Sequence, residues 1–175
     1  MKNYNWAVRF QDIHTAAVKA YEAGRCTPGT MFTADQVAAL AEIGCTPQEL
    51  FDFVEDYCNG GEPPFATVLL ITSLRREYFL TVQHGKPSGR VIDMDALPPK
   101  SEAVDGIAWL PRLIQKARAK LRGEMPPDLM YGCGGDRPFC RKMNVDLADF
   151  LRVVWRAGDN DREIIDYVKR QAGML

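Results

Sequence analysis

The residues best suited to chemistry lie in one glycine-rich segment, residues 131–138, with the sequence Tyr-Gly-Cys-Gly-Gly-Asp-Arg-Pro. A thiol, a carboxylate and a guanidinium follow one another there, at Cys133, Asp136 and Arg137. The glycines between them admit backbone conformations that other residues rarely adopt. A cysteine just before a helix and near a cation is favoured as a thiolate, which is the nucleophilic form. One interpretation of the segment is therefore a thiol-dependent enzyme or redox sensor with Cys133 as its catalytic residue.

The same residues fit a purely structural role. Cysteine is among the most buried residue types and often packs as a small hydrophobic side chain. Asp136 is placed to cap a short helix that ends near Asn144. In this interpretation Cys133 is a core residue and Asp136 stabilises a helix end, so the sequence leaves both roles open.

Two cations precede the segment on one expected helix. Arg112 and Lys116 are four residues apart, so they share a helix face beside the apolar stripe. If both reach Asp136, they form with Tyr131 and Arg137 a site for a carboxylate or phosphate. The alternative is an ion-pair network that ties the helix to the segment. Because no general base is visible near Cys133, the favoured function is a non-enzymatic helical module that binds a small anionic ligand or a partner protein there.

Metal ions and cofactors are not expected. Cys133 and Cys140 are seven residues apart, and the two histidines, His14 and His84, belong to other expected helices, whereas structural zinc takes four well-spaced ligands. His14 is expected at the surface or its boundary. The chain also lacks a P-loop, a dinucleotide fingerprint and a GxSxG motif.

Composition narrows the classes of binding partner and the cellular compartment that we expect for this protein. The chain has 175 residues and a net charge of -1, which gives no electrostatic footprint for nucleic acid or an acidic membrane. No apolar run is long enough to span a bilayer, and the start lacks the apolar run of a signal peptide. Five cysteines, an odd number, indicate free thiols in a cytoplasmic protein. Helical proteins of this size often form homodimers, so a homodimer is also expected.

The elements that must position these residues are helices. Apolar residues recur at helical spacing nearly throughout, and Thr33-x-x-Gln36 and Thr46-x-x-Glu49 have the pattern of capping boxes. Residues 85–108 are rich in glycine and proline and are expected to be an irregular linker, with no sheet. The sequence predicts an all-α fold of about eight helices.

The two halves of the chain have residues that end and cap helices at corresponding positions. A short helix is expected to end at Gly44 and at Asn144, and the next helix to be capped by Thr46 and by Asp146, so the pattern repeats with a constant offset. This predicts a tandem duplication of a four-helix unit. The expected segments are an N-terminal repeat over residues 1–84, a linker over 85–108 and a C-terminal repeat over 109–175, together forming one compact unit.

The C-terminal half resembles a bacterial family catalogued as domain of unknown function 5069. The resemblance is clearest over residues 109–170 and rests on Leu110-Pro-Arg-Leu-Ile-Gln-Lys-Ala-Arg-Ala119, and then on Tyr131, Cys133, Asp136-Arg137, Phe139, Val145-Asp146 and Ile164-Ile165. The family typically has Cys-Pro-Leu-Asp where this chain has Cys-Gly-Gly-Asp, which keeps the thiol-to-carboxylate spacing and loosens the loop. The resemblance implies a helical fold and draws attention to the Cys133 segment, and it implies no reaction.

Overall fold

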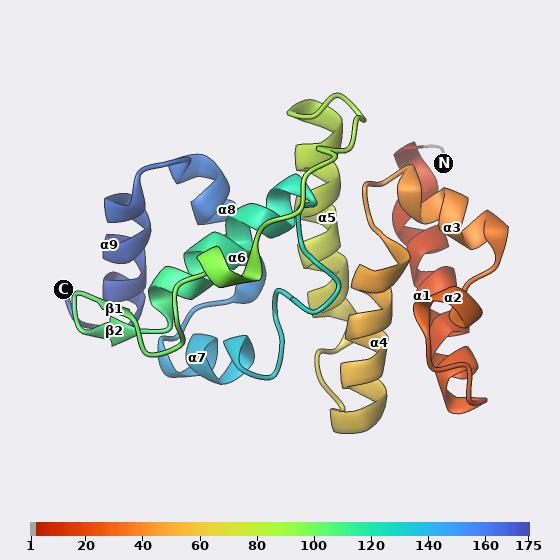
Figure 1. Ribbon diagram of the computed structural model, residues 1–175, viewed down its shortest axis with the longest axis horizontal. Helices are drawn as coiled ribbons and strands as arrows, with labels where there is room; N and C mark the ends of the chain where they lie inside the picture. The colour runs from red at the N-terminus through yellow and green to blue at the C-terminus, as the bar shows by residue number, and fades with distance from the viewer. Residues whose placement is uncertain (1–2) are drawn as a thin grey trace. The chain divides into compact units, whose positions relative to one another are not determined.

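The protein is all-α, as the sequence predicts. The computed structural model describes residues 3–175. Residues 1 and 2 of the predicted N-terminal repeat lie outside that range. The α-helices within it are α1 (Trp6–Glu22), α2 (Pro28–Met31), α3 (Ala34–Ala41), α4 (Pro47–Gly60), α5 (Phe65–Thr81), α6 (Leu110–Arg122), α7 (Asp136–Lys142), α8 (Leu147–Ala157) and α9 (Asp161–Gln171) (Figure 1).

The chain divides into two compact units, with the boundary between Pro87 and Ser88. The first unit holds α1 to α5, and α1 packs against α4 and α5. Both predicted capping boxes are present: the Thr33 and Thr46 side chains each accept from the amide three residues on, and the Gln36 and Glu49 side chains accept in return. These reciprocal bonds pair donors that a helix start otherwise leaves free.

The core of the first unit forms where the apolar stripes of its helices meet. Its fully buried residues include Phe10, Leu40, Leu50, Val54, Val68 and Ile71. His14 lies in this core, at 6 % exposure, with its ring 4.9 Å from the ring of Phe65. The expectation of a surface or boundary position is therefore wrong. The helical stripe of Phe10, Ile13 and Ala17 continues through the position of His14, and the imidazole packs there as an aromatic side chain.

The second unit is built on α6, which packs against α8 and α9. Its buried residues include Leu110, Leu113, Ala117, Phe150, Leu151, Ile164 and Val168. Asp146 caps α8 by accepting from the amides of Ala148 and Asp149, as the sequence predicts. Asn160 occupies the N-cap position of α9 without a side-chain hydrogen bond.

Residues 88–108 are part of the second unit and contain a small antiparallel hairpin of β1 (Ala103–Val104) and β2 (Ile107–Ala108). The expectation of no sheet in this segment is therefore wrong. Asp105 and Gly106 form its turn with φ of 49° and 78°, which suits the aspartate–glycine pair of a tight hairpin. Asp105 also accepts hydrogen bonds from Lys169 and Arg162 of α9, so the hairpin lies beside that helix (Figure 1).

The two units end a short helix in the same way, at positions that differ by a constant offset. Gly44 and Asn144 both adopt left-handed backbone, with φ of 68° and 54°. The amide of Cys45 donates to the carbonyl of Leu40, and the amide of Val145 donates to the carbonyl of Cys140. The tandem duplication itself stays a prediction, which superposition of residues 6–81 on residues 110–171 would test.

Candidate functional site

The candidate site lies in the second unit, where the segment before α7 meets α6. Lys116 projects from the middle of α6, Asp136 is the first residue of α7, and Cys133 lies in the loop that precedes α7. Trp109, immediately before α6, completes the group. Residues distant in the sequence thus form one cluster, hereafter the Cys133 site, defined by Trp109, Lys116, Cys133 and Asp136.

Asp136 is the centre of the site. Its side chain is 0 % exposed, and both carboxylate oxygens accept hydrogen bonds. Oδ1 accepts from Nε1 of Trp109 at 2.9 Å, and Oδ2 accepts from the amide of Gly132 at 2.8 Å and from Nζ of Lys116 at 2.5 Å. A buried carboxylate without such partners would be strongly destabilising. The three donors therefore fix the orientation of the Asp136 carboxylate.

Lys116 supplies the positive charge. Its side chain is 2 % exposed, and its ammonium forms an ion pair with Asp136. The same Nζ lies 3.3 Å from Sγ of Cys133, within hydrogen-bonding distance for sulfur. Because Asp136 holds the ammonium in place, the thiol has a fixed cation beside it.

Cys133 differs from Lys116 and Asp136 in being partly exposed. Its carbonyl accepts from the amides of Asp136 and Arg137, which places the residue at the start of α7. Its Sγ lies beside the buried Lys116 ammonium. Cys133 thus combines a contact to a buried ammonium with partial exposure of the residue.

Trp109 and Gly135 are in close contact. A Cβ atom added to Gly135 would lie 2.6 Å from both Cη2 and Cζ2 of the indole ring, which is closer than atoms can pack. The corresponding atom on Gly134 would have only Nη2 of Arg137 nearby, at 3.8 Å. Of these two glycines, Gly135 therefore allows the close approach of the indole that donates to Asp136.

The other predicted site residues each donate a hydrogen bond to a backbone carbonyl. Nη1 of Arg112 donates to the carbonyl of Pro98, so the expectation that both cations reach Asp136 holds only for Lys116. Nη1 of Arg137 donates to the carbonyl of Gly132 and thereby braces the loop. Tyr131 is 1 % exposed, and its hydroxyl donates to the carbonyl of Leu147. Burial, followed by the charges of nearby acidic groups, raises the pKa of Tyr131 well above its usual value.

The predicted capping role of Asp136 is wrong. The N-cap position of α7 is Gly135, and Asp136 is the first helical residue, with its carboxylate turned into the unit. Sequence reasoning also missed Trp109 and the amide of Gly132 as partners. The signal was present in part, since a partly buried tryptophan usually places its N–H against a hydrogen-bond acceptor.

Cys140, the other thiol of this region, has different properties. It is buried in α7, and burial, followed by the carboxylates of Asp136 and Asp146, raises its pKa to about 12. It will therefore stay a thiol at neutral pH. Within residues 3–175, no three histidine, cysteine or acidic side chains gather as a metal site requires.

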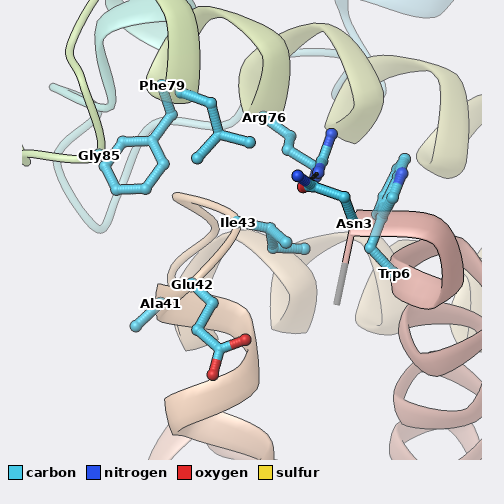
Figure 2. Close-up of a pocket in the computed structure, with 9 residues that line it drawn as sticks. Asn3, Trp6, Ala41, Glu42, Ile43, Arg76, Phe79 and Gly85 are labelled. Carbon is cyan, nitrogen blue, oxygen red and sulfur yellow. Dashed lines mark hydrogen bonds between the residues drawn. The ribbon is translucent and has the colours of Figure 1, made fainter. Parts of the chain in front are cut away.

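Each unit also has a cavity away from this site. In the first unit a cavity of about 270 Å³ has Arg76, Asn3 and Trp6 gathered on one side and Glu42 on another (Figure 2). The Arg76 guanidinium lies over the Trp6 ring, 4.9 Å from its centroid, and donates to Asn3. In the second unit a shallow cavity of about 460 Å³ is lined by Cys140, Arg141, Asn144, Val145, Asp146, Asp149, Tyr167 and Gln171. Neither cavity brings a reactive group to a paired charge as the Cys133 site does.

Comparison with known proteins supports the family and leaves the reaction open. Residues 97–174 match the family described as Domain of unknown function (DUF5069), which is the family that the C-terminal half resembles. No curated protein and no solved structure matched the chain. Among the described residues, no helix is both long and apolar enough to cross a bilayer.

Proposed function

We propose that the protein is a redox sensor in which Cys133 reacts with hydroperoxides. The observation that carries the proposal is the contact of 3.3 Å between Nζ of Lys116 and Sγ of Cys133, with the ammonium held by the buried carboxylate of Asp136. Sensing requires a thiol that is reactive and reachable; the ammonium contact supports the first property and the partial exposure of Cys133 supports the second.

The reaction is a two-electron oxidation of sulfur. Deprotonated Sγ attacks the outer oxygen of a hydroperoxide, an S–O bond forms and the O–O bond breaks. The leaving alkoxide or hydroxide takes up a proton and departs as alcohol or water, and Cys133 becomes a sulfenic acid. The Lys116 ammonium stabilises the negative charge on the attacking sulfur without itself changing protonation.

A thiol-dependent hydrolase has less support. Nucleophilic catalysis normally pairs the cysteine with a general base that is oriented by a third group. Among residues 3–175, the side chain in hydrogen-bonding contact with Sγ is that of Lys116, which is already an ion-pair partner of Asp136. Such an ammonium is suited to stabilising charge rather than to accepting a proton.

A double variant, compared with the unsubstituted protein, tests the sensor proposal. The double substitution Lys116→Met with Asp136→Asn removes the ammonium and the carboxylate together, so neither charge is left buried alone. A charge-assisted hydrogen bond of about 1.5 kcal/mol corresponds to about a tenfold effect on a rate. We therefore expect hydrogen peroxide to oxidise Cys133 about tenfold more slowly in the double variant.

Oxidation is read by trapping sulfenic acid with a 1,3-dicarbonyl reagent and quantifying each cysteine by mass spectrometry. Cys26, an exposed thiol of the first unit, is the internal control and its rate should not change between the two proteins. An unchanged Cys133 rate in the double variant contradicts the proposal, as does a Cys133 that reacts only after unfolding.

Binding of an anionic ligand or a partner protein is the second proposal. The observation that favours it is Arg112, a partly buried guanidinium that donates through Nη1 to Pro98. It is less supported because the Lys116 charge is balanced by Asp136 and Arg137 donates to Gly132. Titration with inorganic phosphate, followed by amide shifts in nuclear magnetic resonance, tests it, and Arg112→Ala should abolish any shift near α6.

A further inference from the structure

The contact between Lys116 and Cys133 also places an amine next to the sulfur. Nζ of Lys116 is 3.3 Å from Sγ, and its stem is enclosed by the packing of α6, so the amine stays next to the sulfur. We propose that oxidised Cys133 closes onto Lys116 and forms a covalent sulfenamide bond between Sγ and Nζ. This inference rests on the proposed function, because its starting point is the sulfenic acid.

The bond forms without a further oxidant. Oδ2 of Asp136 accepts one ammonium proton from Lys116, and this frees the lone pair on Nζ. Nζ then attacks Sγ, the S–N bond forms, and the S–O bond of the sulfenic acid breaks. The departing hydroxide takes a second proton from Nζ and leaves as water. The hydroperoxide that made the sulfenic acid has accepted both electrons, and Asp136 is left protonated.

The surroundings of Cys133 favour an amine as the resolving group. Sulfenic acids condense with a nearby thiol or with a nitrogen, whichever is within reach. Within the described part of the chain, the side chain hydrogen-bonded to Sγ is Lys116 and not another cysteine. Cys140, the next thiol along the chain, is buried within α7. Condensation with Lys116 would also protect the sulfur from irreversible oxidation to the sulfinic acid.

The bond would change the charge of the unit's interior. In the reduced protein Asp136 and Lys116 form a buried ion pair, whereas the sulfenamide nitrogen carries no charge and Asp136 carries a proton. The indole of Trp109 and the amide of Gly132 still donate to Asp136. The oxidised state therefore joins α6 to the loop before α7 and leaves no unpaired charge inside.

The test is a peptide map of the native full chain after exposure to hydrogen peroxide. Free thiols are alkylated, the protein is digested with trypsin, and cross-linked peptides are identified by mass spectrometry. We expect one pair joined through Lys116 and Cys133, lighter by two hydrogen atoms than the sum of the separate peptides. Trypsin should fail to cleave after Lys116, and a thiol reductant should restore both peptides.

Two variants serve as matched controls. Lys116→Arg keeps a positive charge but places a weakly nucleophilic guanidinium next to the sulfur, so we expect Cys133 to be trapped as sulfenic acid without a cross-link. Lys142→Arg changes an exposed lysine of α7 and should leave the cross-link intact.

The outcomes separate this inference from the proposed function. A Lys116–Cys133 cross-link that Lys116→Arg abolishes supports it. A Cys133 that is oxidised but is found only as sulfenic acid, a disulfide or a product that keeps the oxygen overturns the sulfenamide and leaves the sensor proposal standing. A Cys133 that is never oxidised in the native protein overturns both.

Discussion

Breaking the ion pair at the centre of the Cys133 site should cost far more stability than breaking a surface pair. Lys116 is 2 % exposed and Asp136 is 0 % exposed, so either single substitution leaves a charge inside the unit without its partner. Such changes typically cost about 3–5 kcal/mol. In the native protein, Oδ2 of Asp136 accepts hydrogen bonds from both Lys116 and Gly132. In Asp136→Asn, an amide N–H₂ at this position would be a donor that faces these two donors. We therefore expect Asp136→Asn and Lys116→Met each to cost about 3–5 kcal/mol of unfolding free energy.

The double variant provides the decisive comparison. Removing both charges leaves no buried ion, so its cost should be less than the sum of the two single costs by about 1–3 kcal/mol. Urea titration followed by circular dichroism gives the free energies by linear extrapolation. If the two units unfold in separate steps, hydrogen exchange at amides of α6 and α7 gives the local free energy. Single variants that cost under about 1 kcal/mol, as exposed pairs do, would refute the reasoning. So would additive costs.

Three further predictions concern single residues. Gly135→Ala should displace the indole of Trp109 and cost about 1–3 kcal/mol in denaturant titration, whereas Gly134→Ala, whose Cβ would only contact Nη2 of Arg137 at 3.8 Å, should change stability by less than about 0.5 kcal/mol; equal effects would contradict the packing. Burial lowers the pKa of His14, so the folded protein binds this proton less readily than the unfolded chain. Stability should therefore be full above about pH 6.5 and fall as the pH drops below it, and His14→Phe should flatten that dependence; an unchanged slope would contradict it. Cys140, with a pKa of about 12, should resist alkylation in the native protein at about pH 8.5 and react on unfolding; early labelling of Cys140 would contradict its burial.

Much of the fold could be predicted from local sequence signals. The capping boxes at Thr33 and Thr46 and the left-handed positions at Gly44 and Asn144 depend on short-range chemistry, and the structure confirms each of them. The hairpin at residues 103–108 was missed because its strands are two residues long, too short for alternation to show. Its Asp105-Gly106 turn was the one local signal available.

The sequence identified most residues of the candidate site but not their hydrogen-bond partners. Helical spacing places Arg112 and Lys116 on one face, but spacing does not tell which of them turns toward Asp136 and which donates to Pro98. That choice depends on where the loop before α7 crosses α6. The contact of Trp109 with Gly135 depends on the same crossing, so no local pattern could have revealed it.

The most direct test of the central claim compares Cys133 with Cys26 in one native sample. Both thiols are reachable from solvent, Cys26 more so, and only Cys133 has a buried ammonium beside its sulfur. After a brief pulse of hydrogen peroxide below the protein concentration, the fraction of each cysteine trapped as sulfenic acid or cross-link is measured by mass spectrometry. The account predicts that Cys133 carries most of the oxidation although it is the less exposed thiol. Oxidation that follows exposure, with Cys26 ahead of Cys133, would contradict it.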